Sequence, residues 1–97
     1  MSDQKIAVRA RVTGRVQGVA FRAWTQSQAE GLGLDGWVRN EPDGSVSALI
    51  AGPAAAVRKL EEALWSGPPA AEVSDVRVER LDAAALRDSG PGFAITG

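Results

Sequence analysis

The spacing of apolar residues changes several times along this chain, and the order of those changes limits the folds that it can form. Residues 6–12 alternate between two faces, which is typical of a half-buried strand. Residues 14–20 interrupt the alternation with glycines and predict a loop. Residues 21–32 then follow helical spacing, and Gly33 stands where the helix should end. The side of this helix expected to face the core carries Phe21, Trp24, Thr25, Gln28 and Leu32, with Ala29 at its edge.

The middle of the chain predicts a hairpin and a second helix. Strands over residues 34–41 and 45–51 flank the Pro-Asp-Gly turn at 42–44, in which proline fixes φ and glycine accepts a positive φ. Pro53 takes the first position of the second helix, which should stop by Gly67. The buried stripe of this helix is Val57, Leu60 and Leu64.

The last third of the chain completes a known order of elements. It predicts a fourth strand over residues 72–80, a loop over 81–92 with a helical turn at 83–87, and a short strand over 93–96. The β-α-β-β-α-β order with an extra C-terminal strand predicts an α+β, ferredoxin-like sandwich. In that fold two helices cover one face of an antiparallel or mixed sheet. We expect the 97 residues to form one domain, with a core from about residue 6 to 96.

The amino-acid composition removes several kinds of catalysis. The chain has no Cys and no His, so it contains no Ser-His-Asp or Cys-His machinery and no thiolate nucleophile. Its acidic residues are scattered, and their pattern does not predict a metal site. Chemistry in this chain has to come from Arg, Lys, Asp, Glu, Asn, Gln, Ser, Thr or the backbone.

Charge and hydropathy indicate where this chain would bind. The formal net charge of −1 argues against a general nucleic-acid partner. Residues 1–24 nevertheless hold five basic residues and one acidic residue, so a small anion would be attracted to the N-terminal quarter. The first residues lack the apolar region of a signal peptide, and no apolar run approaches membrane-spanning length. We therefore expect a cytoplasmic protein with no membrane partner.

Two places carry residues suited to chemistry on an anion. Gly14 and Gly18 would let the loop between the first strand and helix approach a ligand, with Arg22 in the first helical turn. Arginine binds phosphate or carboxylate oxygens in pairs, although a solvent-exposed arginine explains this pattern equally well. Asn40 lies near the end of the second strand and could orient a water molecule, but the residues alone favour a structural role in which it bonds the following turn.

Both places lie in segments that resemble the signatures of the acylphosphatases. Residues 14–22, GRVQGVAFR, resemble the first signature, and residues 33–40, GLDGWVRN, resemble the second. The pattern continues through Pro42, Asp43, Gly44, Val46, Gly67, Pro68, Ala71, Val73 and Val76. The resemblance covers residues 6–96. Two departures stand out: Ser47 replaces an acidic residue frequent in the family, and the chain ends Thr96-Gly97 without an arginine and an aromatic residue. We expect both to affect strand-edge packing and stability rather than catalysis.

The resemblance implies hydrolysis of the carboxyl–phosphate bond of small acyl phosphates without a metal or other cofactor. We expect inorganic phosphate to act as product and inhibitor, and nothing in the sequence suggests more than a monomer. The resemblance makes Arg22 the phosphate-binding arginine and Asn40 the residue that positions the attacking water. The resemblance also implies that a loop holds the phosphate with its backbone amides, and the residues of this loop are Arg15, Val16, Gln17, Gly18, Val19 and Ala20. The main alternative is a non-catalytic anion-binding or regulatory module on the same fold.

Two further alternatives are less well supported. A domain of a larger carbamoyl-transfer enzyme would be accompanied by zinc-finger cysteines, and this chain has no Cys. An RNA-recognition module would need exposed aromatic residues on its central strands, and the first and third predicted strands have none. We assign Trp24 and Trp37 to the core between helices and sheet, and expect Trp65 to be partly exposed beside Pro68.

Overall fold

The structure, a computed structural model, describes residues 4–82, 84–88 and 90–97, and its elements follow the predicted order. The elements are β1 (Lys5–Arg15), α1 (Phe21–Gly31), β2 (Asp35–Asn40), β3 (Val46–Pro53), α2 (Ala54–Leu64), β4 (Glu72–Arg80), α3 (Ala84–Asp88) and β5 (Phe93–Ile95). The helical turn predicted at 83–87 corresponds to α3, although residue 83 lies outside the described residues.

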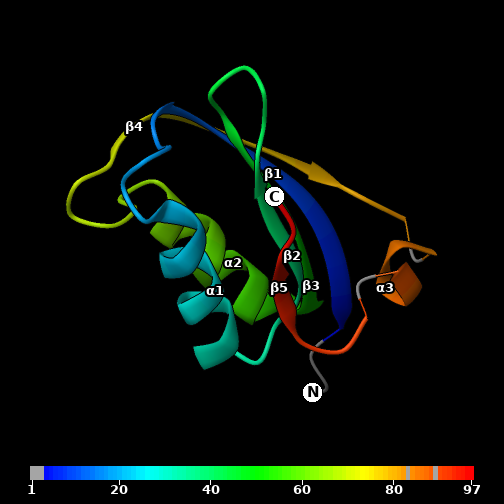
Figure 1. The fold of residues 1–97 in the computed structure, drawn as a ribbon. Helices are drawn as coiled ribbons and strands as arrows, with labels where there is room; N and C mark the ends of the chain where they lie inside the picture. The colour runs from blue at the N-terminus through cyan, green and yellow to red at the C-terminus, as the bar shows by residue number, and fades with distance from the viewer. Residues whose placement is uncertain (1–3, 83, 89) are drawn as a thin grey trace.

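The strands form one mixed sheet in the order β4-β1-β3-β2-β5. β1 runs antiparallel to β3 and β4, and β2 runs antiparallel to β3 but parallel to β5. Figure 1 shows α1 and α2 together on one side of the sheet, with α3 on the other side, where it contacts β1 and β3. The predicted ferredoxin-like sandwich is confirmed, and most of the second face of the sheet carries no helix.

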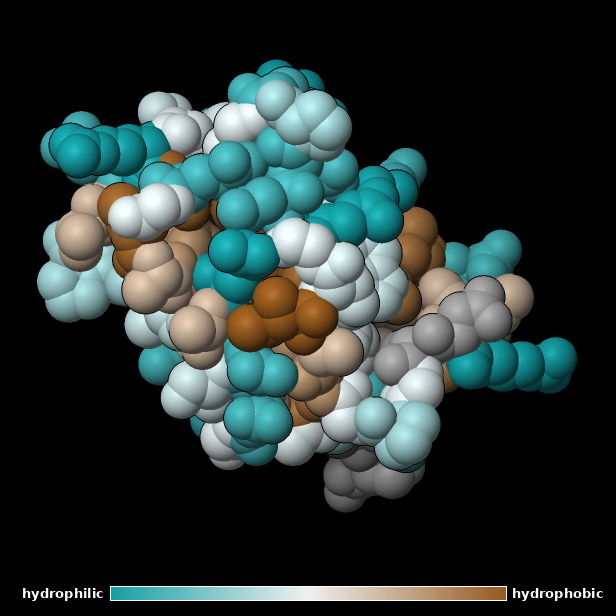
Figure 2. Space-filling model, viewed as in Figure 1, coloured by the Kyte–Doolittle hydropathy of each residue, from teal (hydrophilic) through white to brown (hydrophobic). Residues whose placement is uncertain are grey.

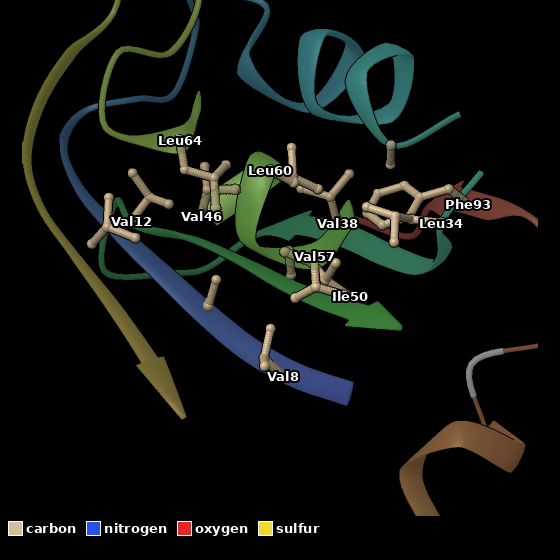
Figure 3. Close-up of a cluster of buried hydrophobic side chains, with 14 of the residues drawn as sticks. Val8, Val12, Leu34, Val38, Val46, Ile50, Val57, Leu60, Leu64 and Phe93 are labelled. Carbon is tan, nitrogen blue, oxygen red and sulfur yellow. The ribbon is translucent and has the colours of Figure 1, made fainter. Parts of the chain in front are cut away.

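The core lies between the sheet and the two longer helices. Side chains of α2 at Val57, Leu60 and Leu64 pack over Val12, Val46 and Ile50 of the sheet (Figure 3), as their spacing predicted. The helix begins at Ala54, so Pro53 precedes it rather than taking its first position. Within the described residues no helix exceeds 11 residues or is apolar enough to cross a membrane.

The buried side of α1 differs from the predicted one. Phe21, Thr25 and Ala29 are buried, whereas Gln28 is exposed and Leu32 is half-buried. Thr25 is tolerated in the core because its hydroxyl donates to the carbonyl of Phe21 at 2.8 Å. The buried stripe therefore follows i, i+4 spacing through Phe21, Thr25 and Ala29. Gln28, a polar residue predicted on this side, lies outside the stripe and is exposed.

The three tryptophans have different environments. Trp24 is half-buried, and its ring centroid lies 5.5 Å from that of Phe21, in agreement with the prediction. Trp65 is exposed at 53% of its surface. The assignment of Trp37 to the core was wrong: Val38 takes the core side of β2, so Trp37 points to the opposite face. There its ring lies 4.6 Å from the guanidinium carbon of Arg39 and 6.0 Å from that of Arg9.

Candidate active site

The loop between β1 and α1 turns sharply at two residues in left-handed conformations. Gly18 has φ +75°, with open space where a Cβ would stand, and Ala20 has φ 63° at the N-cap of α1. Backbone in such conformations, followed by a helix N-terminus, directs N–H groups toward a common centre. The predicted anion cradle thus has a backbone suited to that role.

Gly14 serves a different purpose from the one predicted for it. A Cβ at this position would come within 2.3 Å of the carbonyl oxygen of Glu72 in β4, and φ is +116°. The register between β1 and β4 shifts between Thr13 and Gly14. Gly14 is therefore required for the close pairing of β1 with β4 and not for approach to a ligand.

Arg22 and Asn40, which come from separate segments, line the same pocket of about 230 Å³. The pocket lies between the start of α1 and the ends of β2 and β5, and its lining is Val16, Gly18, Ala20, Phe21, Arg22, Ala23, Asn40 and Ile95. Figure 2 shows a brown, apolar patch near the centre of the view, beside β5, with teal, polar surface above and below it. Ile95 of that strand is 41% exposed.

The predicted loop residues divide into two groups. Val16, Gly18 and Ala20 line the pocket, whereas the other three are absent from its lining. Arg15 is exposed at the end of β1, where it lies opposite Glu72 in the register of β1 and β4, and Val19 is half-buried against the core. Gln17 directs its side chain to the hairpin between β2 and β3, as described below.

One polar atom in this pocket has no protein partner. The Oδ1 atom of Asn40 is the buried side-chain oxygen that the described part of the chain leaves without a hydrogen bond. A buried acceptor without a partner is costly, typically about 1–3 kcal/mol, unless a ligand or water satisfies it. Asn40 thus brings to the lining of the pocket a buried amide oxygen whose hydrogen-bonding capacity no described protein group uses.

The end of the chain joins Arg22 to Asn40, a connection that the sequence analysis missed. The main-chain oxygen of Gly97 accepts a hydrogen bond from Nη1 of Arg22, and the backbone N–H of Asn40 donates to the same oxygen at 3.4 Å. The Thr96-Gly97 ending, expected to affect strand-edge packing and stability, therefore contacts both residues assigned to the site. No local sequence pattern reveals this contact, because Arg22 and Gly97 are 75 residues apart in sequence and meet only in the tertiary structure.

Gln17 connects the loop to the hairpin that follows Asn40. Its side-chain amide donates to the carbonyl oxygens of Glu41 at 2.8 Å and Ser45 at 2.9 Å. Asp43 organises the turn itself, since its carboxylate accepts from the N–H of Ser45 at 2.9 Å and from its hydroxyl at 2.6 Å. The side chain of Gln17 thus has a role that the sequence analysis, which used only its backbone amide, did not find.

Comparison with known proteins agrees with this geometry. The family model of the acylphosphatases matches residues 8–95. The acylphosphatase of Rhizobium meliloti (strain 1021) is 54% identical over 96 residues, which cover 99% of this chain and 98% of that protein.

Solved structures give the same result. The acylphosphatase of Bacillus subtilis has a TM-score of 0.86 and 36% identity, covering 95% of this chain and 99% of the other. An acylphosphatase from Coxiella burnetii has a TM-score of 0.83 and 35% identity, covering 95% and 93%. The sequence signatures, the sheet order and these comparisons agree: the chain belongs to the acylphosphatase family and is a hydrolase that acts on acid anhydrides.

Proposed function

We propose that the chain hydrolyses the carboxyl–phosphate bond of small acyl phosphates in the pocket between α1, β2 and β5, releasing a carboxylate and inorganic phosphate. The observation that carries the proposal is the shared pocket of Arg22 and Asn40, in which the Oδ1 atom of Asn40 has no protein partner. The family membership supports the same reaction.

Binding of the phosphoryl group falls to the loop and to Arg22 in this proposal. The backbone N–H groups of residues 15–20 and the first turn of α1 meet negative charge with partial positive charge. Arg22 adds a permanently charged donor, and it stands at the positive end of the helix dipole, where an arginine without an anion is mildly unfavourable. A bound phosphate would turn that unfavourable placement into a favourable one.

Asn40 positions the attacking water in this proposal. Its Oδ1 atom accepts a hydrogen bond from the water and orients a lone pair toward phosphorus, opposite the carboxylate leaving group. The carboxylate is a good leaving group, so the reaction needs placed charge more than covalent chemistry. The substrate phosphate accepts the proton of the water, since none of the residues lining the pocket is an acid or a histidine.

We also propose that the reaction needs no metal and that one domain of residues 1–97 performs it. The first point rests on the charge of Arg22 and the loop N–H groups, which would stabilise the transferring phosphoryl group without a metal ion. That the protein is a cytoplasmic monomer inhibited by inorganic phosphate stays a prediction.

Hydrolysis of benzoyl phosphate tests the proposal directly. The purified chain should release phosphate continuously, and added inorganic phosphate should compete with the substrate. Arg58→Ala, which changes an exposed arginine of α2 outside the pocket, should keep the full rate. Binding of phosphate without any turnover would contradict the proposal and support the non-catalytic anion-binding module instead.

A further inference from the structure

The uncovered face of the sheet carries a groove of about 640 Å³ lined with charged side chains. Each of its four arginines faces a carboxylate. The pairs are Arg9 and Arg39 with Glu41, Arg11 with Asp43, and Arg77 with Asp75. The groove therefore offers little free positive charge to an external anion. One of its carboxylates, that of Glu41, belongs to the residue that follows Asn40 in the chain.

Glu41 is the most enclosed of these carboxylates. Its side chain is 20% exposed, compared with 50% for Asp43 and 45% for Asp75. It accepts a hydrogen bond from Nε of Arg39 at 3.1 Å, while Nη2 of Arg9 lies at 3.9 Å, and the buried Ser47 lines the same groove. These contacts, with Ser47 contributing most, hold the pKa of Glu41 below its usual value.

The main chain of Glu41 is held as firmly as its side chain. Its N–H donates to the carbonyl of Ser45 at 2.8 Å, and its carbonyl accepts from the side chain of Gln17 at 2.8 Å. Glu41 directly follows Asn40 in the chain. The residue next to Asn40 is thus fixed from the cradle side by Gln17 and from the uncovered face by its own carboxylate.

We propose that Glu41 is a positioning residue for this reaction: anchored by Arg39, Arg9 and Ser47 on the uncovered face, it fixes the main chain from which Asn40 reaches the phosphate cradle. The inference rests on the proposed function, because it concerns the placement of the attacking water. It also gives a role to Ser47, one of the two departures from the family pattern, as a buried hydroxyl that lines the same groove and favours the ionised form of Glu41.

The physical consequence is a separation of binding from turnover. Phosphate binding depends on the loop and Arg22. The loop contacts the main-chain carbonyl of Glu41 through Gln17, and this carbonyl stays when the carboxylate is removed, so phosphate binding should survive the loss of the anchor. The attack depends on the position of Asn40 relative to phosphorus, and displacements of about 1 Å can slow a reaction about 10²-fold. Removal of the Glu41 carboxylate should therefore lower kcat and leave phosphate affinity unchanged.

The test compares Glu41→Ala and Glu41→Gln with the unmodified chain. For each we would measure kcat and KM with benzoyl phosphate, the inhibition constant of inorganic phosphate, and thermal stability. Glu41→Ala should lower kcat about tenfold or more. This is less than the effect of about 10²-fold expected for a displacement of about 1 Å of Asn40 relative to phosphorus. Glu41→Gln keeps an acceptor for Ser47 and Arg39 and should recover most of the rate. If Glu41→Ala does not fold, Ser47→Ala replaces it in the test. This variant removes one polar neighbour of Glu41 and should lower kcat by a smaller factor, again with unchanged inhibition by phosphate.

The chain offers a matched control on the same face. Asp75 and Arg77 form a pair of the same chemistry in β4, with Nε of Arg77 at 3.2 Å from the carboxylate, and neither residue adjoins Asn40. Asp75→Ala should keep the unmodified kcat. The inference is overturned if Asp75→Ala slows turnover as much as Glu41→Ala, or if Glu41→Ala leaves kcat unchanged.

Two more outcomes separate the inference from the proposed function. If Glu41→Ala weakens phosphate inhibition in parallel with kcat, Glu41 supports the whole site and is not a positioning residue. If the unmodified chain fails to hydrolyse benzoyl phosphate, the proposed function itself fails, and the inference with it.

Discussion

At the scale of single residues, the pocket depends on two side chains with different tasks. Arg22 and Asn40 come from different elements and meet through a shared acceptor, the main-chain oxygen of Gly97. Arg22 carries the charge that would bind phosphate, and Asn40 carries an unpartnered oxygen that would bind water. Substitutions at the two positions should therefore have different effects.

Arg22→Ala should abolish measurable phosphate binding and lower the rate about 10²–10³-fold, as is typical for the loss of one preorganised electrostatic contact. Asn40→Ala should keep phosphate affinity and lose turnover, because it removes only the partner of the water. Isothermal titration with phosphate, alongside benzoyl phosphate hydrolysis, checks both. Phosphate binding that disappears in Asn40→Ala would contradict the division of tasks.

Ala20 has a backbone conformation that is unfavourable for its side chain. Its φ of 63° lies in the left-handed region, which costs an L-residue about 1–2 kcal/mol and glycine almost nothing. Glycine also increases the conformational entropy of the unfolded chain, which lowers the free energy of unfolding by about 0.4–1 kcal/mol and so offsets part of that gain. Ala20→Gly should thus raise the free energy of unfolding by up to about 1.5 kcal/mol, measured by urea denaturation.

Ala23, three residues later inside α1, is the control for that substitution. It has an ordinary helical position, so Ala23→Gly should lower the free energy of unfolding by about 0.5–1 kcal/mol. If both glycines destabilise the chain equally, the left-handed conformation at residue 20 stores no strain.

At the scale of elements, the hairpin of β2 and β3 connects the two faces of the sheet. Its turn receives Gln17 from the cradle side, and Glu41 directs its carboxylate to the uncovered face. The element was predictable from its alternation and its Pro-Asp-Gly turn. Its contacts were not, because Gln17 and its acceptors are 24 and 28 residues apart.

The ionisation of Glu41 makes the stability of this hairpin depend on pH. The hydroxyl of Ser47 and the guanidinium of Arg39 lower the pKa of Glu41 in the folded chain below its usual value of 4.5. A carboxyl group with a lowered folded pKa stabilises the fold above its unfolded pKa, and that contribution is lost as pH falls through the folded pKa. The stability difference between the unmodified chain and Glu41→Gln should be constant near neutrality and shrink below about pH 4.5. Thermal unfolding at several pH values checks this, and a difference that stays constant into strong acid would contradict it.

At the scale of the whole molecule, the core places the site without contributing chemistry. α1 and α2 pack on one face, which sets the start of α1 opposite the end of β2. β5 then closes the pocket beside them, parallel to β2, with Val38 opposite Ile95. The pocket is thus assembled from the N-terminal, middle and C-terminal parts of the chain.

Metal independence is a prediction about the whole molecule. Dialysis against EDTA should leave benzoyl phosphate hydrolysis unchanged, because the charge that stabilises the transition state is expected from Arg22 and the loop amides. Added Mg²⁺ should likewise have little effect on the rate. Loss of activity in EDTA with recovery on adding a divalent cation would show that the proposed mechanism lacks a component.

Sequence alone determined the order of the elements, the buried stripe of α2 and the two segments that carry Arg22 and Asn40. It could do so because hydrophobic periodicity and turn chemistry are local properties. Only the tertiary structure decided the side of β2 on which Trp37 lies, the pairing purpose of Gly14, the contact of Gly97 with Arg22, and the enclosure of Glu41. Each of these depends on which strands become neighbours and in which register, and pairing between distant segments leaves no local pattern to read.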